Sequence, residues 1–382
     1  MVQEEILGQN ALVQQWINAL QRGRVPHALL LSEAGGYGAL KLAWHFATDL
    51  LASTLNSPEE KERCRMRCRK AEHPDLHFIF PVATTDQVKS HPRSELFLEP
   101  WRQFILQQPY SSLNQWYKHV GLEKKQGLIN VEEAEDLIKK MAFKAFEGGA
   151  KVVVVWEAHK MNTPAANKLL KLIEEPPEGT YLLLVSSEPE QLLQTIYSRC
   201  QHLRLSPLSE KEIETALLNN GASTDQALHL AQQSHGDLAK ALEMQGDGGE
   251  LQAFEQWFVD WVRTAFRAKG NKAVVENLLD WSIELAGLGR EQQKQFLSYC
   301  SQQFRLALML NYGLPVQTPS FAATQFKFEK FAPFVHENNI EELREELEKA
   351  QYHIERNVSA KMVFGDLALA LTRLIHRKPL TP

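Results

Sequence analysis

Cysteine is scarce in this chain, whose 382 residues include only Cys64, Cys68, Cys200 and Cys300. So sparse a set excludes a disulfide-stapled fold and is typical of a reducing compartment. Long apolar runs are also missing, because none approaches the roughly 20 residues that cross a bilayer. The start MVQEEILGQN lacks the basic flank and apolar core of a signal peptide. We therefore expect a cytoplasmic protein that makes no membrane contact.

An excess of basic charge is missing as well. Lys and Arg number 42 against 47 Asp and Glu, and the formal net charge is -5 at pH 7. No whole-protein field attracts DNA, so any nucleic-acid contact must be local or shared with partners. The hydrophobic share of 44% and the charged share of 23% are those of a globular protein long enough for two or three domains.

Short apolar runs alternate with amphipathic helical patterns over residues 1–206. The runs are Ala28–Leu31, Leu76–Phe80, Val152–Trp156, Tyr181–Val185 and Leu203–Leu205. This alternation predicts an α/β domain whose parallel sheet is covered by helices. Residues 82–130 interrupt the rhythm with polar, aromatic-bearing sequence. We interpret this stretch as a partly helical insertion before a helix over residues 131–146.

The strand-like runs stop after Pro207. Ser209 and Glu212 have the spacing of a capping box and predict the start of a helix. About three short helices are expected over residues 207–246, with Gly246–Gly249 as a linker. The pattern over residues 251–382 is helical throughout. We therefore expect a small helical domain and then an all-α C-terminal domain.

A glycine-rich turn, SEAGGYGALKLA over residues 32–43, follows the first apolar run in the setting of a phosphate-binding loop. The pattern required there is GxxxxGK[ST]. With Gly38 on its second glycine, Glu33 stands at the first glycine, Ala39 at the lysine and Leu40 at the Ser/Thr. The cation that neutralises phosphate and the hydroxyl that holds Mg²⁺ are both missing. A plain glycine turn that packs a helix on its strand remains the alternative. The glycines of this degenerate loop are Gly35, Gly36 and Gly38.

The second pattern of a nucleotide site is a run of four apolar residues followed by Asp-Glu, which organise Mg²⁺ and the attacking water. Here Val152–Val155 are followed by Trp156 and Glu157. An indole cannot ligate Mg²⁺, so this loss is independent of the loss in the loop. Together the two departures indicate a degenerate ATP site.

Two longer stretches resemble the clamp-loader branch of the AAA+ family: NTPAANKLLKLIEEPP at 162–177 and LQTIYSRCQ at 193–201. Shorter pieces support the resemblance, namely ILGQ at 6–9, RVPHA at 24–28 and HPD at 73–75.

The resemblance is strong over residues 1–206, fair to about 245 and weak beyond. It implies an AAA+ RecA-like domain over 1–206, a helical lid over 207–246 and a helical collar, or oligomerisation, domain over 251–382.

The tripeptide Ser198-Arg199-Cys200 is the part of the resemblance that carries a mechanism. In the family this arginine reaches the neighbouring subunit's ATP as an arginine finger, and its planar fork of donors suits phosphate charge. The resemblance therefore assigns that catalytic contribution to Arg199, with Ser198 and Cys200 in its motif. Motor subunits of the family carry a second arginine in the lid, where this chain has Ala239.

The implied function is a clamp-loader subunit of the bacterial DNA polymerase III holoenzyme that hydrolyses no ATP itself. It would act as a stator while the sliding clamp is loaded, and we expect it to need no cofactor. The implied partners are ATPase subunits of the gamma/tau type, a delta-type subunit and, through the complex, the sliding clamp and primer–template DNA. The alternative is an active AAA+ ATPase of a clamp loader or branch-migration helicase complex, which requires the residues missing above.

Relatives in this branch carry a four-cysteine zinc module where this chain has only Cys64 and Cys68. Structural zinc needs four ligands, and His73 and His77 are the available substitutes. We expect no bound metal and interpret the cysteines as the remnant of a zinc site. The six basic residues within 61–70 leave open a local DNA contact.

Overall fold

The structure is a computed structural model that describes residues 6–123, 125–246, 248–268, 271–314, 316, 321 and 324–379. It divides into two compact units. The first, called the sheet unit, is Met1–Leu122 with Gln126–Gly246, and the second, called the helical unit, is Glu123–Lys125 with Asp247–Pro382.

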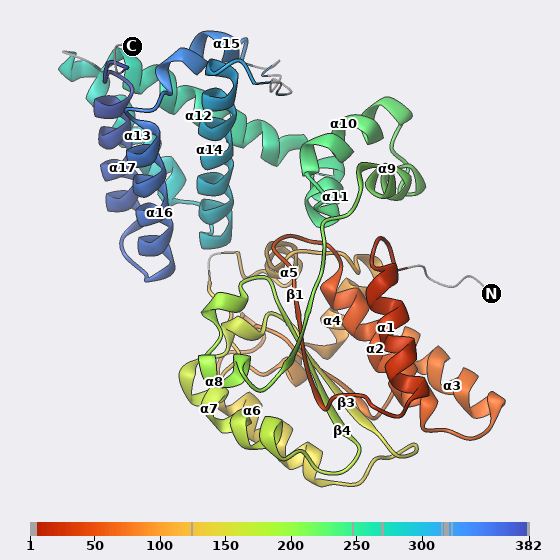
Figure 1. Cartoon of the computed structure of the whole chain (residues 1–382). Helices are drawn as coiled ribbons and strands as arrows, with labels where there is room; N and C mark the ends of the chain where they lie inside the picture. The colour runs from red at the N-terminus through yellow and green to blue at the C-terminus, as the bar shows by residue number, and fades with distance from the viewer. Residues whose placement is uncertain are drawn as a thin grey trace. The chain divides into compact units, whose positions relative to one another are not determined.

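A parallel sheet of five strands forms the centre of the sheet unit, in the order β2-β3-β4-β1-β5 (Figure 1). The strands are β1 (Ala28–Ser32), β2 (Leu76–Ile79), β3 (Lys151–Val155), β4 (Thr180–Ser186) and β5 (Gln201–Arg204). Each contains or overlaps one of the predicted apolar runs. The central strands are apolar along their length because helices cover both faces of the sheet.

Helices form a layer on each face of this sheet (Figure 1). Leu29 and Leu31 of β1 pack into the apolar cluster with α1, α2 and α3, whereas Ala28 and Leu30 pack into the cluster with α6 and α7. This alternation follows from the two-residue period of a strand. The bounds of these helices are α1 (Asn10–Gln21), α2 (Ala39–Ser53), α3 (Pro58–Arg69), α6 (Val131–Ala142) and α7 (Thr163–Glu174).

The predicted insertion contains the helices α4 (Leu98–Gln107) and α5 (Leu113–His119). Its tryptophans Trp101 and Trp116 are fully buried, with ring centroids 5.2 Å apart, and belong to the main core beside the sheet. The buried Trp116 Nε1 donates to the carbonyl oxygen of Pro81 at 2.9 Å. The segment is therefore a structural part of the core rather than an appendage.

The helix expected over 131–146 ends earlier, because α6 stops at Ala142 and Phe143 is extended. The Lys151 ammonium donates to the carbonyl oxygens of Met141 and Phe143 at the end of the helix. The Asp75 carboxylate accepts the N–H groups of Phe146 and Glu147, both at 2.7 Å. These contacts from distant residues terminate the helix, so the predicted end was wrong.

Three helices, α9 (Glu210–Asn219), α10 (Thr224–Ser234) and α11 (Leu238–Gly246), follow the sheet and share an apolar cluster of their own. Ser209 caps α9 as predicted, since its hydroxyl accepts the N–H of Glu212. We call these helices the lid.

The linker predicted at Gly246–Gly249 was largely wrong. The helix α11 includes Gly246 and α12 begins at Gly248, while Asp247 lies outside the described residues. Glycine costs a helix only about 1 kcal/mol relative to alanine. The adjoining helical turns can offset that cost.

The helical unit contains no strand among its described residues and has a core rich in aromatic side chains. Its longer helices are α12 (Gly248–Arg267), α13 (Lys272–Ala286), α14 (Arg290–Asn311), α16 (Ile340–Glu355) and α17 (Ala360–Leu374), with α15 (Phe328–Phe331) between α14 and α16. The expected fold class, a parallel α/β domain followed by helical regions, is confirmed. None of the helices that the structure describes is long and apolar enough to cross a membrane.

Candidate functional site

The glycine-rich loop after β1 is closed by the side-chain carboxyl group of Glu33, a residue of the loop itself. Glu33 Oε2 accepts the backbone N–H of Tyr37 at 2.8 Å and that of Ala39 at 3.0 Å. In a phosphate-binding loop, amide donors of this kind converge on the oxygens of the nucleotide phosphates. Here a side chain of the loop itself occupies them.

The lid contacts the same loop from its other side. The carbonyl oxygen of Gly36 accepts the N–H groups of Leu238 at 3.1 Å and Ala239 at 3.3 Å. The Asp237 carboxylate, which accepts the N–H of Lys240 at 2.9 Å, lies beside the backbone of Gly35 and Gly36. A Cβ at Gly36 would lie 2.1 Å from the Cβ of Ala239 in the lid, so only glycine fits this approach. The position of the family's second arginine is thus packed directly against the loop.

Gly38 is the N-cap residue of α2 and lies in the left-handed region, with φ +102°; a Cβ there would lie 2.5 Å from the Tyr110 ring. Ala39 and Leu40, at the positions of the missing Lys and Ser/Thr, are buried in the first turn of α2. The next cation along, Lys41, lies over the Tyr110 ring with its Nζ 5.0 Å from the ring centroid. It therefore does not replace the missing lysine of the loop.

The surroundings of the loop are acidic where a nucleotide site needs positive charge. Burial raises the pKa of Glu33 to about 8, and the nearby carboxyls of Glu157 and Asp237 add to the rise. Burial likewise raises the pKa of Asp237. At neutral pH the Glu33 carboxyl group is therefore mostly protonated and uncharged. Its Oε2 accepts the N–H groups of Tyr37 and Ala39 in that state.

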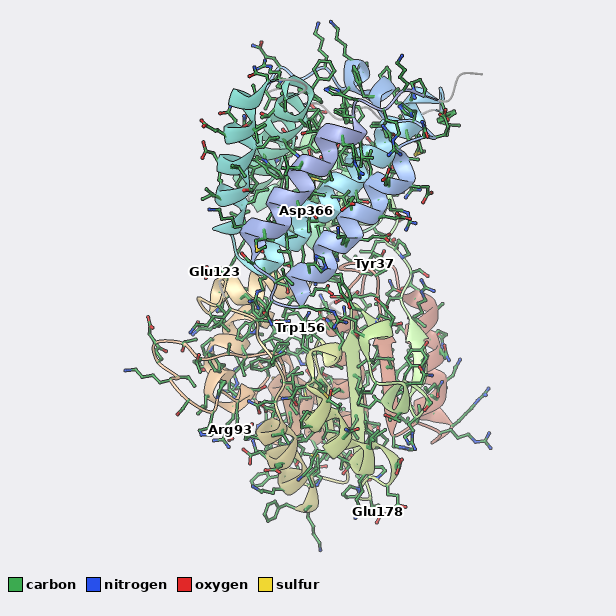
Figure 2. The ribbon with its side chains drawn as sticks, turned by 90° about the vertical axis from the view of Figure 1, so that its left-hand side faces the viewer. Tyr37, Arg93, Glu123, Trp156, Glu178 and Asp366 are labelled. Carbon is green, nitrogen blue, oxygen red and sulfur yellow. The ribbon has the colours of Figure 1, made fainter. Side chains whose placement is uncertain are left out.

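Trp156, which replaces the aspartate that would hold Mg²⁺, lies just after β3 and is 2% exposed. Its ring centroid is 5.2 Å from that of Trp101 and 6.3 Å from that of Phe104, both on α4. Trp156 and Tyr37 follow parallel strands and lie toward the same end of the sheet unit (Figure 2). At the position of the missing metal ligand, the indole therefore packs into the hydrophobic core.

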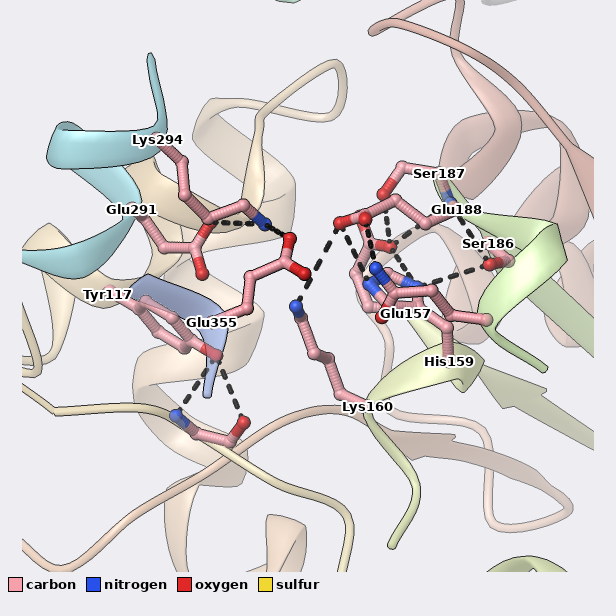
Figure 3. A network of polar contacts seen from close by, with 12 residues as sticks. Tyr117, Glu157, His159, Lys160, Ser186, Ser187, Glu188, Glu291, Lys294 and Glu355 are labelled. Carbon is pink, nitrogen blue, oxygen red and sulfur yellow. Dashed lines mark hydrogen bonds and ion pairs between the residues drawn. The ribbon is translucent and has the colours of Figure 1, made fainter. Parts of the chain in front are cut away.

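Glu157, the remaining acidic residue of this motif, is buried and already engaged (Figure 3). Its Oε2 accepts the Ser187 N–H at 3.2 Å and the Ser187 hydroxyl at 2.8 Å. The same oxygen is 3.3 Å from His159 Nδ1. The carboxylate therefore joins the ends of β3 and β4 instead of facing a water molecule.

Arg199 lies between the short helix α8 (Gln194–Tyr197) and β5, with 39% of its side chain exposed. Its Nη1 donates to the carbonyl oxygen of Thr195 at 2.9 Å, and its Nε is 2.5 Å from Glu174 Oε1. Ser198 donates to the same carbonyl at 3.4 Å, and Cys200 is buried. The motif thus holds one guanidinium at the surface.

Arg199 and the glycine-rich loop lie at opposite ends of the neighbouring strands β5 and β1. Gln201, two residues after Arg199, pairs with Leu29, which is four residues before Glu33. A parallel strand rises about 3.3 Å per residue, so the two ends are at least about 13 Å apart. The guanidinium is therefore at the wrong end of the strands to act on a nucleotide at its own loop.

Cys64, Cys68 and His73 form a buried cluster whose possible ligand atoms lie within 4.8 Å of one another. His77, the other proposed substitute, is not in this cluster. A hydrogen bond with the Cys68 thiol lowers the pKa of Cys64 to about 5, while the same bond raises the pKa of Cys68. A structural zinc site has four ligands. Among the residues that the structure describes, this set is one short.

Sequence reasoning missed the roles of Glu33, Asp237 and Tyr110 in closing the loop. A signal was present for Glu33, because an acidic residue stands where the loop pattern requires glycine. No comparable signal marked Tyr110, which comes from the insertion 72 positions after Gly38.

The fold and the site define a class: a parallel α/β domain followed by small helices, in which both nucleotide motifs are degenerate. Residues 8–209 match the family model described as "DNA polymerase III, delta subunit". The chain belongs to this family.

Curated relatives agree with that assignment. DNA polymerase III subunit delta' of Bacillus subtilis is 28% identical over 230 residues, which cover 59% of this chain and 56% of that protein. Subunit delta' of Escherichia coli is 28% identical over 301 residues, covering 78% and 74%. Subunit tau of Escherichia coli is 26% identical over 246 residues, covering 63% and 32%. The matches thus span from a third to three quarters of these relatives, which are DNA polymerase III subunits delta' and tau.

Solved structures were matched at low similarity. The RuvB Holliday junction branch migration motor of Thermotoga maritima has 15% identity and a TM-score of 0.39 over 86% of each chain. A DNA polymerase III gamma subunit-related protein of the same organism has 13% identity and a TM-score of 0.37 over 95% of this chain and 100% of that one. Likenesses at this level carry no argument about function.

Proposed function

We propose that this chain is a delta'-type clamp-loader subunit that hydrolyses no ATP and supplies Arg199 to the ATP site of a neighbouring subunit. The proposal that the chain hydrolyses no ATP rests on the hydrogen bonds in the loop after β1. Its amide donors at Tyr37 and Ala39 are taken by Glu33, so a nucleotide phosphate could not use these two donors without displacing the carboxyl group. Two further losses, at Ala39 and Trp156, remove the lysine and the metal ligand of the site.

The second half rests on the place and chemistry of Arg199. A guanidinium keeps its charge at any working pH and can form two parallel hydrogen bonds to phosphate oxygens. This one is exposed and lies at the end of the strands opposite the chain's own loop. A nucleotide on an adjacent subunit is the substrate that such an arginine fits, where it would stabilise transition-state charge.

The partners follow from this role. ATPase subunits of the gamma/tau type would bind the face that carries Arg199, a delta-type subunit would complete the assembly, and the complex would place the sliding clamp on primer–template DNA. The helical unit would act as the collar that holds the subunits together. We propose that the chain works in the cytoplasm and needs no resident cofactor.

The alternative, an active ATPase subunit, would require a lysine and a hydroxyl residue at the start of α2. Ala39 and Leu40 occupy these positions and are buried. No feature of the described site favours this alternative.

The test is a reconstituted clamp loader that contains the R199A variant, with DNA-stimulated ATP hydrolysis measured in single turnovers. We expect turnover at the adjacent site to fall about 1000-fold or more, since arginine fingers contribute on that scale. R199K should recover little, because lysine lacks the planar fork. R22A, which removes an exposed arginine at the end of α1, is the matched control. Unchanged turnover with R199A in a fully assembled complex would refute the finger.

A further inference from the structure

The loop after β1 keeps the donor geometry of an oxyanion site although it has lost the cation and the hydroxyl. The amides of Tyr37 and Ala39 both point at a single oxygen, Glu33 Oε2. Two N–H donors that converge on one oxygen, at the start of a 15-residue helix, form the arrangement that binds phosphate in other loops. The turn is therefore intact, and what differs is its occupant.

We propose that Glu33 is a built-in plug of this turn, whose carboxyl oxygen takes the place of a phosphate oxygen and holds the loop in its bound shape without a ligand. The plug deepens the proposed function and rests on it only for the expectation that this chain turns over no nucleotide. The residues at positions 39 and 156 explain the loss of phosphate and metal binding, but they do not explain why the loop is closed. Glu33 explains the closure.

The lid completes the plug from the opposite side. The Asp237 carboxylate lies beside the backbone of Gly36, and the amides of Leu238 and Ala239 donate to the Gly36 carbonyl oxygen. A phosphate entering the turn would have to expel the Glu33 carboxyl and face the Asp237 and Glu157 carboxyls, whose charges act on the same region. The loop and the lid therefore form one closed structure.

A direct consequence is that removal of the carboxyl should uncover an oxyanion site. The E33A variant would leave the amides of Tyr37 and Ala39 without their acceptor, and unpaired donors in a half-buried turn favour a small anion. E33Q should not uncover the site, because its amide oxygen can accept the same hydrogen bonds. E190A removes an exposed glutamate of the same unit and serves as the matched control.

The experiment compares the thermal midpoint of the full-length chain in inorganic phosphate, in acetate and in chloride at equal ionic strength. Acetate is included because Asp237 remains in place in E33A and disfavours a doubly charged anion. At phosphate or acetate concentrations well above the dissociation constant, we expect the thermal midpoint of E33A to be about 3 °C higher than in chloride. Wild type, E33Q and E190A should respond equally to the three salts. A folded E33A that responds like wild type would overturn the proposal.

Hydrogen exchange at single amides provides a second measurement that does not depend on E33A being stable. In the wild-type chain and in E33Q, the amides of Tyr37 and Ala39 should exchange at least tenfold more slowly than their intrinsic rates. Exchange of both amides at the intrinsic rate in wild type would overturn the plug. Because these measurements need no partner subunit, their failure would leave the Arg199 test untouched, and failure of the Arg199 test would leave the plug untouched.

Discussion

Arg199 and Glu174 form an ion pair between the loop before β5 and the last residue of α7, with the guanidinium Nε 2.5 Å from the carboxylate oxygen Oε1. The pair joins the two stretches of sequence that resemble the clamp-loader branch. It holds the partly exposed guanidinium against the end of α7. On the proposed function, Glu174 helps to position the finger before a neighbouring nucleotide is met.

This pair leads to a first prediction, for the E174A variant. Both side chains are about 40% exposed, at 39% and 43%, so the pair should contribute at most about 1 kcal/mol to the free energy of unfolding. In the reconstituted complex we expect a loss of turnover of up to about tenfold, because the arginine remains but is less well oriented. Urea denaturation and single-turnover hydrolysis measure the two effects. A loss as deep as that of R199A, or none, would contradict a positioning role.

Trp156 supports a second prediction, which separates packing from chemistry. Replacing it by aspartate restores the residue type of a magnesium ligand but buries a carboxyl group among Trp101 and Phe104. We expect W156D to lose at least about 3 kcal/mol of unfolding free energy, since truncation of a buried tryptophan alone costs about 3–5 kcal/mol. It should gain no ATP binding, because Glu33 still occupies the loop. W156F is the conservative control and should cost less. Tight Mg-ATP binding by W156D in calorimetry would show that the plug is not needed.

The pKa of Glu33 supports a third prediction, on pH. In the folded chain it is raised from 4.5 to about 8, so between pH 5 and 8 the native state binds more protons than the unfolded state. The free energy of unfolding should therefore fall as the pH rises through this window, by up to about 1.4 kcal/mol per pH unit from this group.

The glutamine of E33Q has no titratable group, so the free energy of unfolding of this variant should lack the part of the pH-dependent fall that comes from Glu33. Urea denaturation at pH 5, 6, 7 and 8 should show E33Q gaining stability relative to wild type toward the alkaline end. E190Q, with an exposed glutamate replaced, should follow the wild-type curve. Parallel curves for E33Q and wild type would show that Glu33 titrates near its ordinary pKa.

The cluster of Cys64, Cys68 and His73 supports a fourth prediction. It offers three of the four ligands that structural zinc takes, and His73 Nδ1 already accepts the N–H of Asp75 at 3.1 Å. We expect the purified chain to contain far less than one zinc per molecule in elemental analysis. EDTA should leave its thermal midpoint unchanged, because the cysteines are held by burial and by their mutual hydrogen bond. Stoichiometric zinc that EDTA removes with a fall in the midpoint would contradict this.

Local sequence patterns predicted much of the fold. Apolar runs overlapped all five strands and matched β1, β3 and β4 well, because a buried parallel strand must be apolar on both faces wherever it lies in the chain. The edge strand β5 shares only Leu203 and Arg204 with its run, since its residues other than Leu203 are exposed. The capping box at Ser209 marked the start of α9 for a similar reason, since its hydrogen bonds span only three residues. By contrast, the end of α6 was missed because Asp75 and Lys151, both remote in sequence from its last turn, decide it.

For the site, the sequence by itself determined what chemistry is missing: no lysine at position 39, no hydroxyl at 40 and no carboxylate at 156. Residue identity is sufficient for such losses, because no fold can make alanine a cation or indole a magnesium ligand. Only the tertiary structure decided what fills the space, since Glu33, Asp237 and Tyr110 meet at the loop through folding of segments up to 204 positions apart. Hydrogen bonds and packing act over a few ångströms in space, and sequence distance does not reveal which groups come that close.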